Sequence, residues 1–361
     1  MKDRVAVRIL QARPCCAADT QPRFSRFSAA QEALASGALR TGGLVTEGTA
    51  GSTGISLAMM APAFGALDQA TCSEACSRLL SASGCKCHVV MPDDAAEEKA
   101  VTIAALGASV QRVRPVSIAH PEHFVNVARR AAASAVASGG PGAAYFADQF
   151  ENEANYRAHF DGTGAEVWAQ TRGALHAFVA AAGTGGTLAG CGAALRARDP
   201  AVRLYLVDPP GSSLFNRVTR GVLYARQEAE GRRTRHQVDT ITEGIGINRL
   251  TANFAKAPRL DGAFRGSDAE AVAMARHLRA ADGLFVGSSA AMNAVGALRV
   301  AQLLGPGHTV VTLLCDGGAR HLSKFWSDDY LAQAGLLPPP EQAGRELELL
   351  MAGALRPADD T

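Results

Sequence analysis

The stretch GTGGT is the part of the chain best suited by residue type to hold a phosphate. It follows an apolar run and opens an alanine-rich, helix-like segment. Glycines let backbone N–H groups converge on an anion, and a helix start adds partial positive charge. The predicted phosphate ligands are Gly183, Thr184, Gly185, Gly186 and Thr187.

The spacing of this loop departs from two common phosphate motifs. Leucine at position 188 breaks the G-x-G-x-x-G pattern, and no Gly-Lys-Ser/Thr follows as a P-loop requires. Glycine pairs also mark ordinary turns, so a strand-to-helix turn without a ligand is the alternative for this loop taken alone.

A second loop, TEGTAGSTGIS, combines glycines with hydroxyls at another predicted helix start. Thr49, Ser52 and Thr53, with the amides around Gly51, are suited to hold a carboxylate. The alternative is a helix start capped by Ser52 or Thr53 with no ligand.

Two shorter segments add candidate ligands. FVGSSAAMNA places Ser288 at a predicted strand-to-helix junction, where its hydroxyl either caps the helix or donates to a heteroaromatic nitrogen. TEGIGINR supplies glycine-lined backbone around Gly244, and a flexible bend is the alternative there.

The elements that position these loops alternate along the chain. Strand-like apolar runs such as CKCHVVM precede helical stretches such as residues 93–107, which we expect to open on acidic caps and end at Gly107. This alternation predicts an α/β fold of two parallel-sheet domains, with ligands at the carboxyl ends of the strands.

The domain organisation follows from breaks in that alternation. We predict an N-terminal domain over 1–149, a second domain over 150–336 and a tail over 337–361. Residues 11–42 and 61–84 are weakly periodic and are interpreted as surface insertions.

Amino-acid composition limits the kinds of binding partner that the protein is expected to have. The 361 residues carry a formal net charge of +2 and only 6% aromatic residues, which argues against nucleic acid and a membrane surface as partners. We therefore expect a small-molecule substrate.

The eight cysteines, without a secretory leader, indicate reduced thiols and an intracellular, cytoplasmic or mitochondrial, compartment. Cys191 and Cys315 are predicted core residues. A cluster of thiols and an imidazole has no recognised zinc spacing, so no metal is predicted; its members are Cys72, Cys76, Cys85, Cys87 and His88. Four further histidines are assigned to the surface or the core: His120, His123, His159 and His321.

In their order, these segments resemble the fold-type II pyridoxal-phosphate enzymes, which have the tryptophan synthase β-subunit fold. The resemblance is closest to the cysteine synthase and cystathionine β-synthase family, and within it to a eukaryotic cysteine synthase 2-like branch. TEGTAGSTGISLA resembles the substrate loop, DQFENEANYRAHF the Q-F-x-N-x-x-N segment, and ADGLFVGSSAAMNA the segment that binds the pyridine nitrogen. LLCDGGARHLSKFW resembles the closing strand and turn.

The resemblance implies roles for particular residues. MKDRVAVRIL matches the second half of the segment that carries the Schiff-base lysine, so Lys2 is the expected catalytic and cofactor-binding lysine. The resemblance adds Gln149 and Gly244 to the predicted substrate site. It also implies that Ser288 hydrogen-bonds the pyridine nitrogen of the cofactor. Ser52 replaces the asparagine of the substrate loop that usually bonds the pyridine hydroxyl, so the resemblance implies that Ser52 binds the cofactor as well as the substrate. The part of the family pattern that precedes the lysine is expected to be missing.

The implied activity is β-replacement on O-acetylserine or serine with sulfide or a thiol, by a transferase or lyase with pyridoxal phosphate as cofactor. Lys2 would remove and return the Cα proton. The alternatives are a cystathionine β-synthase, a serine/threonine dehydratase, or a non-catalytic binding or regulatory relative. The family is commonly dimeric, so a homodimer is expected.

Overall fold

The computed structural model describes residues 28–63, 84–225 and 240–337. They form two compact units, here called the N-terminal unit (28–63 and 84–158) and the C-terminal unit (159–225 and 240–337). The sequence analysis placed the boundary after Gln149, whereas the structure divides between Ala158 and His159. The predicted catalytic residue, Lys2, lies outside the described residues.

The N-terminal unit is built on a parallel sheet with the strand order β3-β2-β1-β4. Its described elements are α1 (Ser28–Ala35), β1 (Leu44–Gly48), α2 (Ser52–Met60), η1 (Ala61–Ala63), β2 (Lys86–Pro92), α3 (Glu97–Ala105), β3 (Ser109–Val113), α4 (Phe124–Gly139), β4 (Ala144–Phe146) and α5 (Glu153–Ala158). In the register of the sheet, Val45 of β1 stands beside Cys87 of β2 and Tyr145 of β4.

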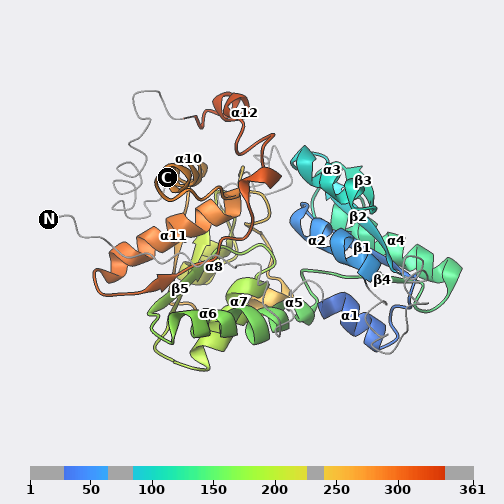
Figure 1. Ribbon diagram of the computed structural model, residues 1–361, viewed down its shortest axis with the longest axis horizontal. Coiled ribbons are helices and arrows are strands. Elements are labelled where there is room, and N and C mark those ends of the chain that lie inside the picture. The colour runs from blue at the N-terminus through green and yellow to red at the C-terminus, as the bar shows by residue number, and fades with distance from the viewer. Residues whose placement is uncertain (1–27, 64–83, 226–239, 338–361) are drawn as a thin grey trace, which may run out of the picture. The chain divides into compact units, whose positions relative to one another are not determined.

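Helices cover both faces of this sheet. α2 and α3 lie on one face and α4 lies on the other (Figure 1). Val89 packs with the α2 and α3 side, while its neighbour Val90 packs with α4, because successive side chains of a strand point to opposite faces. α4 approaches β1 closely, since a Cβ at Gly48 would lie 2.6 Å from Val125 Cα.

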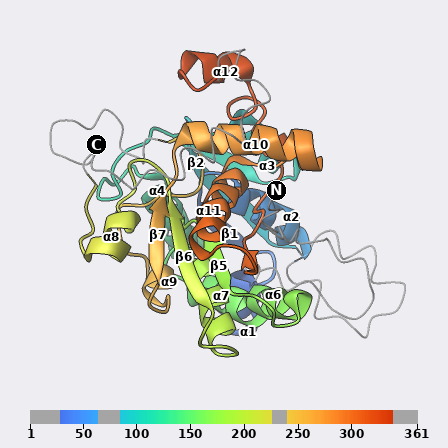
Figure 2. The same ribbon diagram turned by 90° about the vertical axis from the view of Figure 1, so that its left-hand side faces the viewer.

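The C-terminal unit contains a second parallel sheet, with the strand order β7-β6-β5-β8. Its described elements are the π-helical turn η4 (His159–Thr163), α6 (Gly164–Thr171), β5 (Ala177–Ala180), α7 (Gly186–Arg196), β6 (Arg203–Asp208), α8 (Leu214–Arg220), α9 (Ala252–Ala255), β7 (Gly262–Arg265), α10 (Asp268–Asp282), α11 (Ser288–Leu304), β8 (Val310–Val311), η6 (Gly318–Arg320) and α12 (Asp328–Gln333). Strands β5, β6 and β7 lie side by side in Figure 2.

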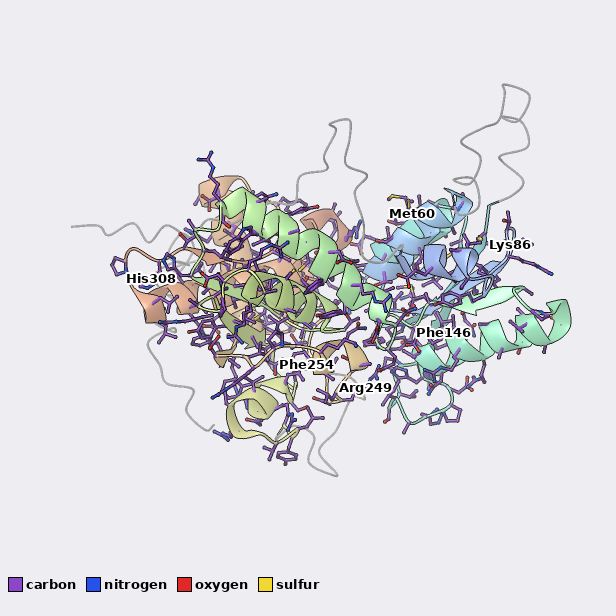
Figure 3. The ribbon with its side chains drawn as sticks, turned by 90° about the horizontal axis from the view of Figure 1, so that it is seen from below. Met60, Lys86, Phe146, Arg249, Phe254 and His308 are labelled. Atoms are coloured by element: carbon purple, nitrogen blue, oxygen red, sulfur yellow. The ribbon has the colours of Figure 1, made fainter. Side chains whose placement is uncertain are left out.

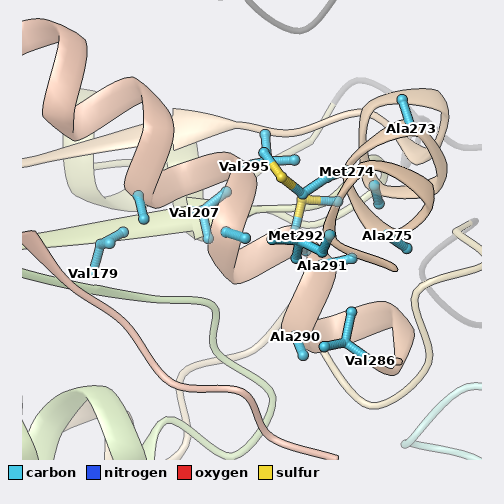
Figure 4. Packing of buried hydrophobic residues seen from close by; sticks show 14 of the residues in the cluster. Val179, Val207, Ala273, Met274, Ala275, Val286, Ala290, Ala291, Met292 and Val295 are labelled. Atoms are coloured by element: carbon cyan, nitrogen blue, oxygen red, sulfur yellow. The ribbon is translucent and has the colours of Figure 1, made fainter. Parts of the chain in front are cut away.

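α10 and α11 pack over one face of this sheet, and α6 and α7 over the other. Met274 of α10 and Met292 of α11 lie beside Val207 of β6 in the core (Figure 4). A Cβ at Gly296 would lie 2.7 Å from Val207 Cβ, so the glycine lets α11 approach the sheet. Both sheets are parallel and covered on both faces, which confirms the predicted fold class.

Several local expectations differ from the structure. Residues 28–42, assigned by sequence to a surface insertion, contribute the buried side chains of Ala30, Ala33 and Leu39, because α1 packs on the sheet core. The N-cap of α3 is Ala96 rather than an acidic residue, and Glu97 and Glu98 lie in the first helical turn. The rest of the first insertion, residues 64–83 of the second, and the tail from 338 onward lie outside the described residues.

Within the described part of the chain, every helix is too short or too polar to cross a membrane.

Candidate active site

The predicted substrate loop joins β1 to α2 in the N-terminal unit. Gly51 is the N-cap of α2, with φ 128°, a value that favours glycine. A Cβ at this position would lie 2.4 Å from Cδ of Lys99, a fully buried lysine of α3. Because Gly51 is the N-cap, Ser52 and Thr53 are the first helical residues, and the alternative in which one of them is the N-cap is wrong.

The loop hydroxyls are fixed by hydrogen bonds. Thr49 and Thr53 are both buried, and the Gly51 N–H donates to Thr49 Oγ1 over 3.2 Å. Thr53 Oγ1 donates to Gln149 Oε1 over 2.6 Å, and Gln149 Nε2 donates to the Gly48 carbonyl over 2.9 Å. The structure therefore brings Gln149 to the loop, as the resemblance implied.

Gln149 is held in turn by the segment around it. Its backbone N–H donates to Oε2 of Glu47, a fully buried residue of β1, over 3.3 Å. Asn155 Nδ2 donates to the Gln149 carbonyl over 2.9 Å, and Asn152 Nδ2 donates to the Ala147 carbonyl over 3.2 Å. These amides explain the polar character of the Q-F-x-N-x-x-N segment, because each one holds a turn of the chain in place.

The predicted phosphate loop joins β5 to α7 in the C-terminal unit. Gly185 is the N-cap of α7, has φ 83°, and makes no side-chain capping bond. A Cβ at Gly185 would lie 2.4 Å from Cβ of Phe254 in α9 (Phe254 is labelled in Figure 3). The first N–H groups of an α-helix have no partner within the helix, so the start of α7 offers donors to an anion.

The glycine segment around Gly244 packs against the same loop. A Cβ at Gly183 would lie 2.0 Å from the Gly244 carbonyl oxygen, and the Gly246 N–H donates to the Ala182 carbonyl over 2.8 Å. Gly244 has φ 85°. Only glycine at position 183 permits this approach, so the two predicted segments form one backbone cradle.

Both threonines of the phosphate loop have protein partners. Thr184 Oγ1 accepts from the Gly186 N–H over 3.4 Å. Thr187 Oγ1 lies 3.0 Å from Nε2 of His159, whose Nδ1 lies 3.0 Å from Thr163 Oγ1. The sequence analysis assigned His159 to the surface or core and missed this link; its place shortly after the Q-F-x-N-x-x-N segment was the available signal.

Ser288 is the first residue of α11, and its side chain is fully buried. Its Oγ has no hydrogen-bond partner among the described residues. The N-cap is Gly287 and makes no side-chain capping bond, so the alternative in which this serine caps the helix is wrong. A buried hydroxyl without a partner costs about 1–3 kcal/mol, which a bound acceptor or donor would recover.

α11 is tied to the strands that carry the phosphate loop. Asn293 Oδ1 accepts from the Ala181 N–H over 2.7 Å, and Asn293 Nδ2 donates to the Leu313 carbonyl over 2.8 Å. This fully internal amide fixes the start of α11 relative to the end of β5. Asn293 therefore ties the helix that carries Ser288 to the strand end that precedes the phosphate loop within the C-terminal unit.

Burial raises the pKa values of one carboxyl group and three thiols in the described residues. Burial raises the pKa of Asp208, at the end of β6, to about 6, against hydrogen bonds from the α8 backbone and Ser212 that lower it. Burial also raises the pKa of Cys87 to about 12, and the pKa values of Cys85 and Cys191 are raised for the same reason. These thiols are free and stay protonated.

The cysteine predictions hold in part. Cys191 is a core residue as expected, whereas Cys315 is exposed, so the prediction for Cys315 was wrong. Its strand, β8, ends at Val311, which leaves Cys315 in the segment that follows. Across the described ranges, no three His, Cys, Asp or Glu side chains gather as a metal site.

A protein-family model described as "Pyridoxal-phosphate dependent enzyme" matches residues 70–316, more than half of the chain. The chain belongs to this family of pyridoxal-phosphate-dependent enzymes. Cysteine synthase 2 of Schizosaccharomyces pombe is 50% identical over 296 residues, which are 81% of this chain and 70% of that protein. Cysteine synthase 2 of Emericella nidulans is 49% identical, over 80% of this chain and 65% of that protein.

Further relatives extend the comparison. A Saccharomyces cerevisiae protein proposed to be a mitochondrial cysteine synthase is 46% identical over 79% of this chain and 68% of that protein. The chain spans 59% to 70% of the length of the cysteine synthase 2 proteins of S. pombe, E. nidulans and Neurospora crassa.

Solved structures of similar proteins support the fold assignment. The O-acetylserine-dependent cystathionine β-synthase from Helicobacter pylori matches with a TM-score of 0.64 and 28% identity, over 83% of this chain and 84% of that chain. O-ureido-L-serine synthase matches with a TM-score of 0.65 and 26% identity, over 86% of each chain. The predicted fold-type II architecture is confirmed.

The residues present fit the family's cofactor. The absence of a Cβ at Gly183 and Gly185 lets Gly244 and Phe254 pack against the loop. The N–H groups at the start of α7 are suited to bind a phosphate. The buried, unpartnered hydroxyl of Ser288 suits the ring nitrogen. A helix start suited to an anion and a buried serine hydroxyl in one unit match the phosphate and the ring nitrogen of pyridoxal phosphate.

Proposed function

We propose that the chain is a cysteine synthase that replaces the β-substituent of O-acetylserine, or of serine, with sulfide or a thiol. The observation that carries this proposal is 49–50% identity to cysteine synthase 2 proteins over 79–81% of the chain. The hydrogen-bonded substrate loop supports it, because that loop is built to hold a small anionic ligand.

In this proposal the start of α2 binds the substrate carboxylate. The N–H groups of its first turn carry partial positive charge and meet no side-chain cap. Thr49 and Ser52 supply hydroxyl donors. The Thr53 hydroxyl donates to Gln149 over 2.6 Å, which fixes the loop, so Thr53 contributes its main-chain N–H to the carboxylate. Ser52 is shorter than the asparagine of the family pattern, so this loop leaves more space beside the substrate.

The C-terminal unit would hold the cofactor. The start of α7 binds the phosphate through its N–H groups and the two loop threonines, while Ser288 Oγ faces the ring nitrogen. Gly244 brings its backbone against the phosphate loop, and its assignment as a substrate-binding residue stays a proposal. When bound, pyridoxal phosphate supplies an electron sink for the charge that develops at the substrate Cα.

Lys2 is the proposed base. Its amine would hold the cofactor, take the proton from the substrate Cα and later return it. An amine in a desolvated pocket has a lowered pKa, which suits both tasks. Lys2→Ala should abolish turnover and leave phosphate-dependent binding of the cofactor measurable.

The test is a product assay on purified protein loaded with pyridoxal phosphate. O-acetylserine with sulfide should give cysteine, and serine with sulfide should give less, because hydroxide is the poorer leaving group. Cysteine formation by the Lys2→Ala variant at the wild-type rate would contradict the assignment of Lys2. No cysteine from either substrate, with the cofactor bound, would contradict the cysteine synthase proposal.

A second candidate is cystathionine β-synthase activity. The likeness to the H. pylori O-acetylserine-dependent enzyme favours it, since that protein shares the fold and 28% of aligned residues. Cystathionine formed from homocysteine faster than cysteine from sulfide would support this alternative. Keto acid from serine or threonine alone would indicate a dehydratase, and cofactor binding without any product would indicate a binding or regulatory protein.

Assembly and compartment are also proposals. A homodimer is the expected state, and light scattering on the purified chain tests it. The relative from S. cerevisiae supports a mitochondrial location, which fractionation of the source cells would test against a cytoplasmic one.

A further inference from the structure

The segment that follows β8 folds back against the entry to α11. Val286 forms an antiparallel bridge with Gly317, and the Gly287 N–H donates to the Asp316 carbonyl over 3.0 Å. Trp326 Nε1 adds a hydrogen bond of 2.9 Å to the Val286 carbonyl. The peptide that carries Ser288 is therefore held from one side by residues 316–326.

A buried acid–imidazole pair forms the centre of that contact. His321 Nε2 lies 3.0 Å from Asp316 Oδ2, and the two side chains are 2% and 7% exposed. Because a carboxylate only accepts hydrogen bonds, Nε2 carries the proton of this bond. The Phe325 ring packs edge-on to the His321 imidazole, with the two ring centroids 6.4 Å apart, and helps to fix the imidazole.

The pair fills the space beside Gly287. A Cβ at Gly287 would lie 1.9 Å from Asp316 Oδ1 and 2.8 Å from His321 Nε2. The two side chains therefore pack directly against the backbone of Gly287, and the next residue is Ser288. The Ser288 hydroxyl is one of the buried side-chain polar atoms for which the described residues provide no hydrogen-bond partner.

We infer that Asp316 and His321 are positioning residues that aim Ser288 Oγ at the ring nitrogen of the cofactor. The inference rests on the proposed function, because it needs Ser288 to meet that nitrogen. Asp316 supports Gly287 by accepting a hydrogen bond at its main-chain carbonyl and by packing its side chain against the glycine. The contact with His321 fixes the rotamer of that side chain. A buried carboxylate that loses its partner must turn or become protonated, and either change releases the support.

The test compares two ligands that differ only at the ring nitrogen. Pyridoxal phosphate and its analogue with CH in place of the ring nitrogen are titrated into the apoprotein, and the ratio of dissociation constants is measured. The wild type should prefer pyridoxal phosphate by about tenfold, the worth of one buried hydrogen bond. Ser288→Ala should bring the ratio close to one.

His321→Ala and Asp316→Ala should also reduce the ratio, by at least about threefold, since a misplaced hydroxyl no longer distinguishes the two rings. His321→Gln places an amide donor near the position of Nε2 and should retain most of the preference. Arg276→Gln is the matched control: it removes an ion pair to Asp328 in the same unit and should leave the ratio unchanged.

The outcomes separate this inference from the proposed function. Equal ratios in wild type, His321→Ala and Asp316→Ala, with all three folded by circular dichroism, would overturn the inference and leave the role of Ser288 intact. No preference in the wild type would overturn the role of Ser288 as well. Should an alanine variant not fold, Asp316→Asn removes the charge at nearly constant volume and gives the same comparison.

Discussion

Thr53 Oγ1 and Gln149 Oε1 are joined by a 2.6 Å hydrogen bond although 96 residues separate them in the chain. The bond exists because β1 and β4 are neighbours in the sheet, so the loops that follow them meet at one edge. Gln149 Nε2 also donates to the Gly48 carbonyl, so the Gln149 side chain holds both ends of the loop.

Replacing Gln149 should therefore loosen the substrate loop. Gln149→Ala removes the acceptor of the Thr53 hydroxyl and the donor to Gly48, and the free energy of unfolding should fall by about 1–2 kcal/mol. The KM for the amino-acid substrate should rise about tenfold, with a smaller change in kcat. Steady-state kinetics and urea unfolding measure both. Gln111→Ala, at an exposed position of β3, serves as the control and should change neither.

The phosphate cradle should not tolerate a side chain at position 185. Gly185→Ala combines a positive φ of 83° with a Cβ placed 2.4 Å from Phe254 Cβ, so α9 or the loop must move. The affinity for pyridoxal phosphate should fall at least about 30-fold, the loss of two or more phosphate hydrogen bonds. Fluorescence titration of the apoprotein measures it.

Gly307→Ala provides a control for the backbone strain. Gly307 has φ 86°, and a Cβ at this position would have no heavy atom within 4 Å, so the cost of the substitution is conformational only. The variant should lose about 1 kcal/mol of stability and keep wild-type cofactor affinity. Equal affinities for Gly185→Ala and Gly307→Ala would show that the α7 loop does not bind the phosphate.

His159 should tune the phosphate loop through Thr187. His159→Leu removes the 3.0 Å contact from Nε2 to Thr187 Oγ1 and frees that hydroxyl to rotate. The dissociation constant of pyridoxal phosphate should rise about three- to tenfold, while His159→Gln should recover part of the loss. Thr163→Val is the matched control, because it removes only the contact on the far side of the ring. A loss in Thr163→Val equal to that in His159→Leu would contradict a direct role for the Thr187 contact.

Asp208 should make the protein less stable as pH rises. Burial raises the pKa of this carboxyl from 3.8 to about 6, so between those values the folded state binds more protons than the unfolded state. The free energy of unfolding should therefore fall as pH rises from about 4 to 6, and the loss is complete above that range.

Asp208→Asn removes this titration. The variant should be more stable than the wild type at pH 7.5 by up to about 3 kcal/mol, with the difference shrinking at pH 4.5. Urea unfolding at both pH values measures the effect, and Asp282→Asn, at an exposed site, should show no such trend. A wild-type stability that rises between pH 4.5 and 7.5 by more than that of Asp208→Asn would contradict the prediction.

Sequence alone identified the α/β class and most element positions, because strands buried on both faces read as apolar runs between helical stretches. It also found the loops at Gly51, Gly185 and Gly244, since a positive φ or a close backbone approach requires glycine. It wrongly assigned α1 to a surface insertion, because eight residues are too few for a clear helical period. It also wrongly predicted that Cys315 is buried.

The chain order of the motifs thus determined which residue types are available for chemistry. Only the tertiary structure decided which of them meet: Gln149 with Thr53, His159 with Thr187, and Asp316 with His321 beside Gly287. The physical reason is that sheet order and register bring the carboxyl ends of distant strands to one edge. Side chains there pair according to distances that no local pattern in the sequence records.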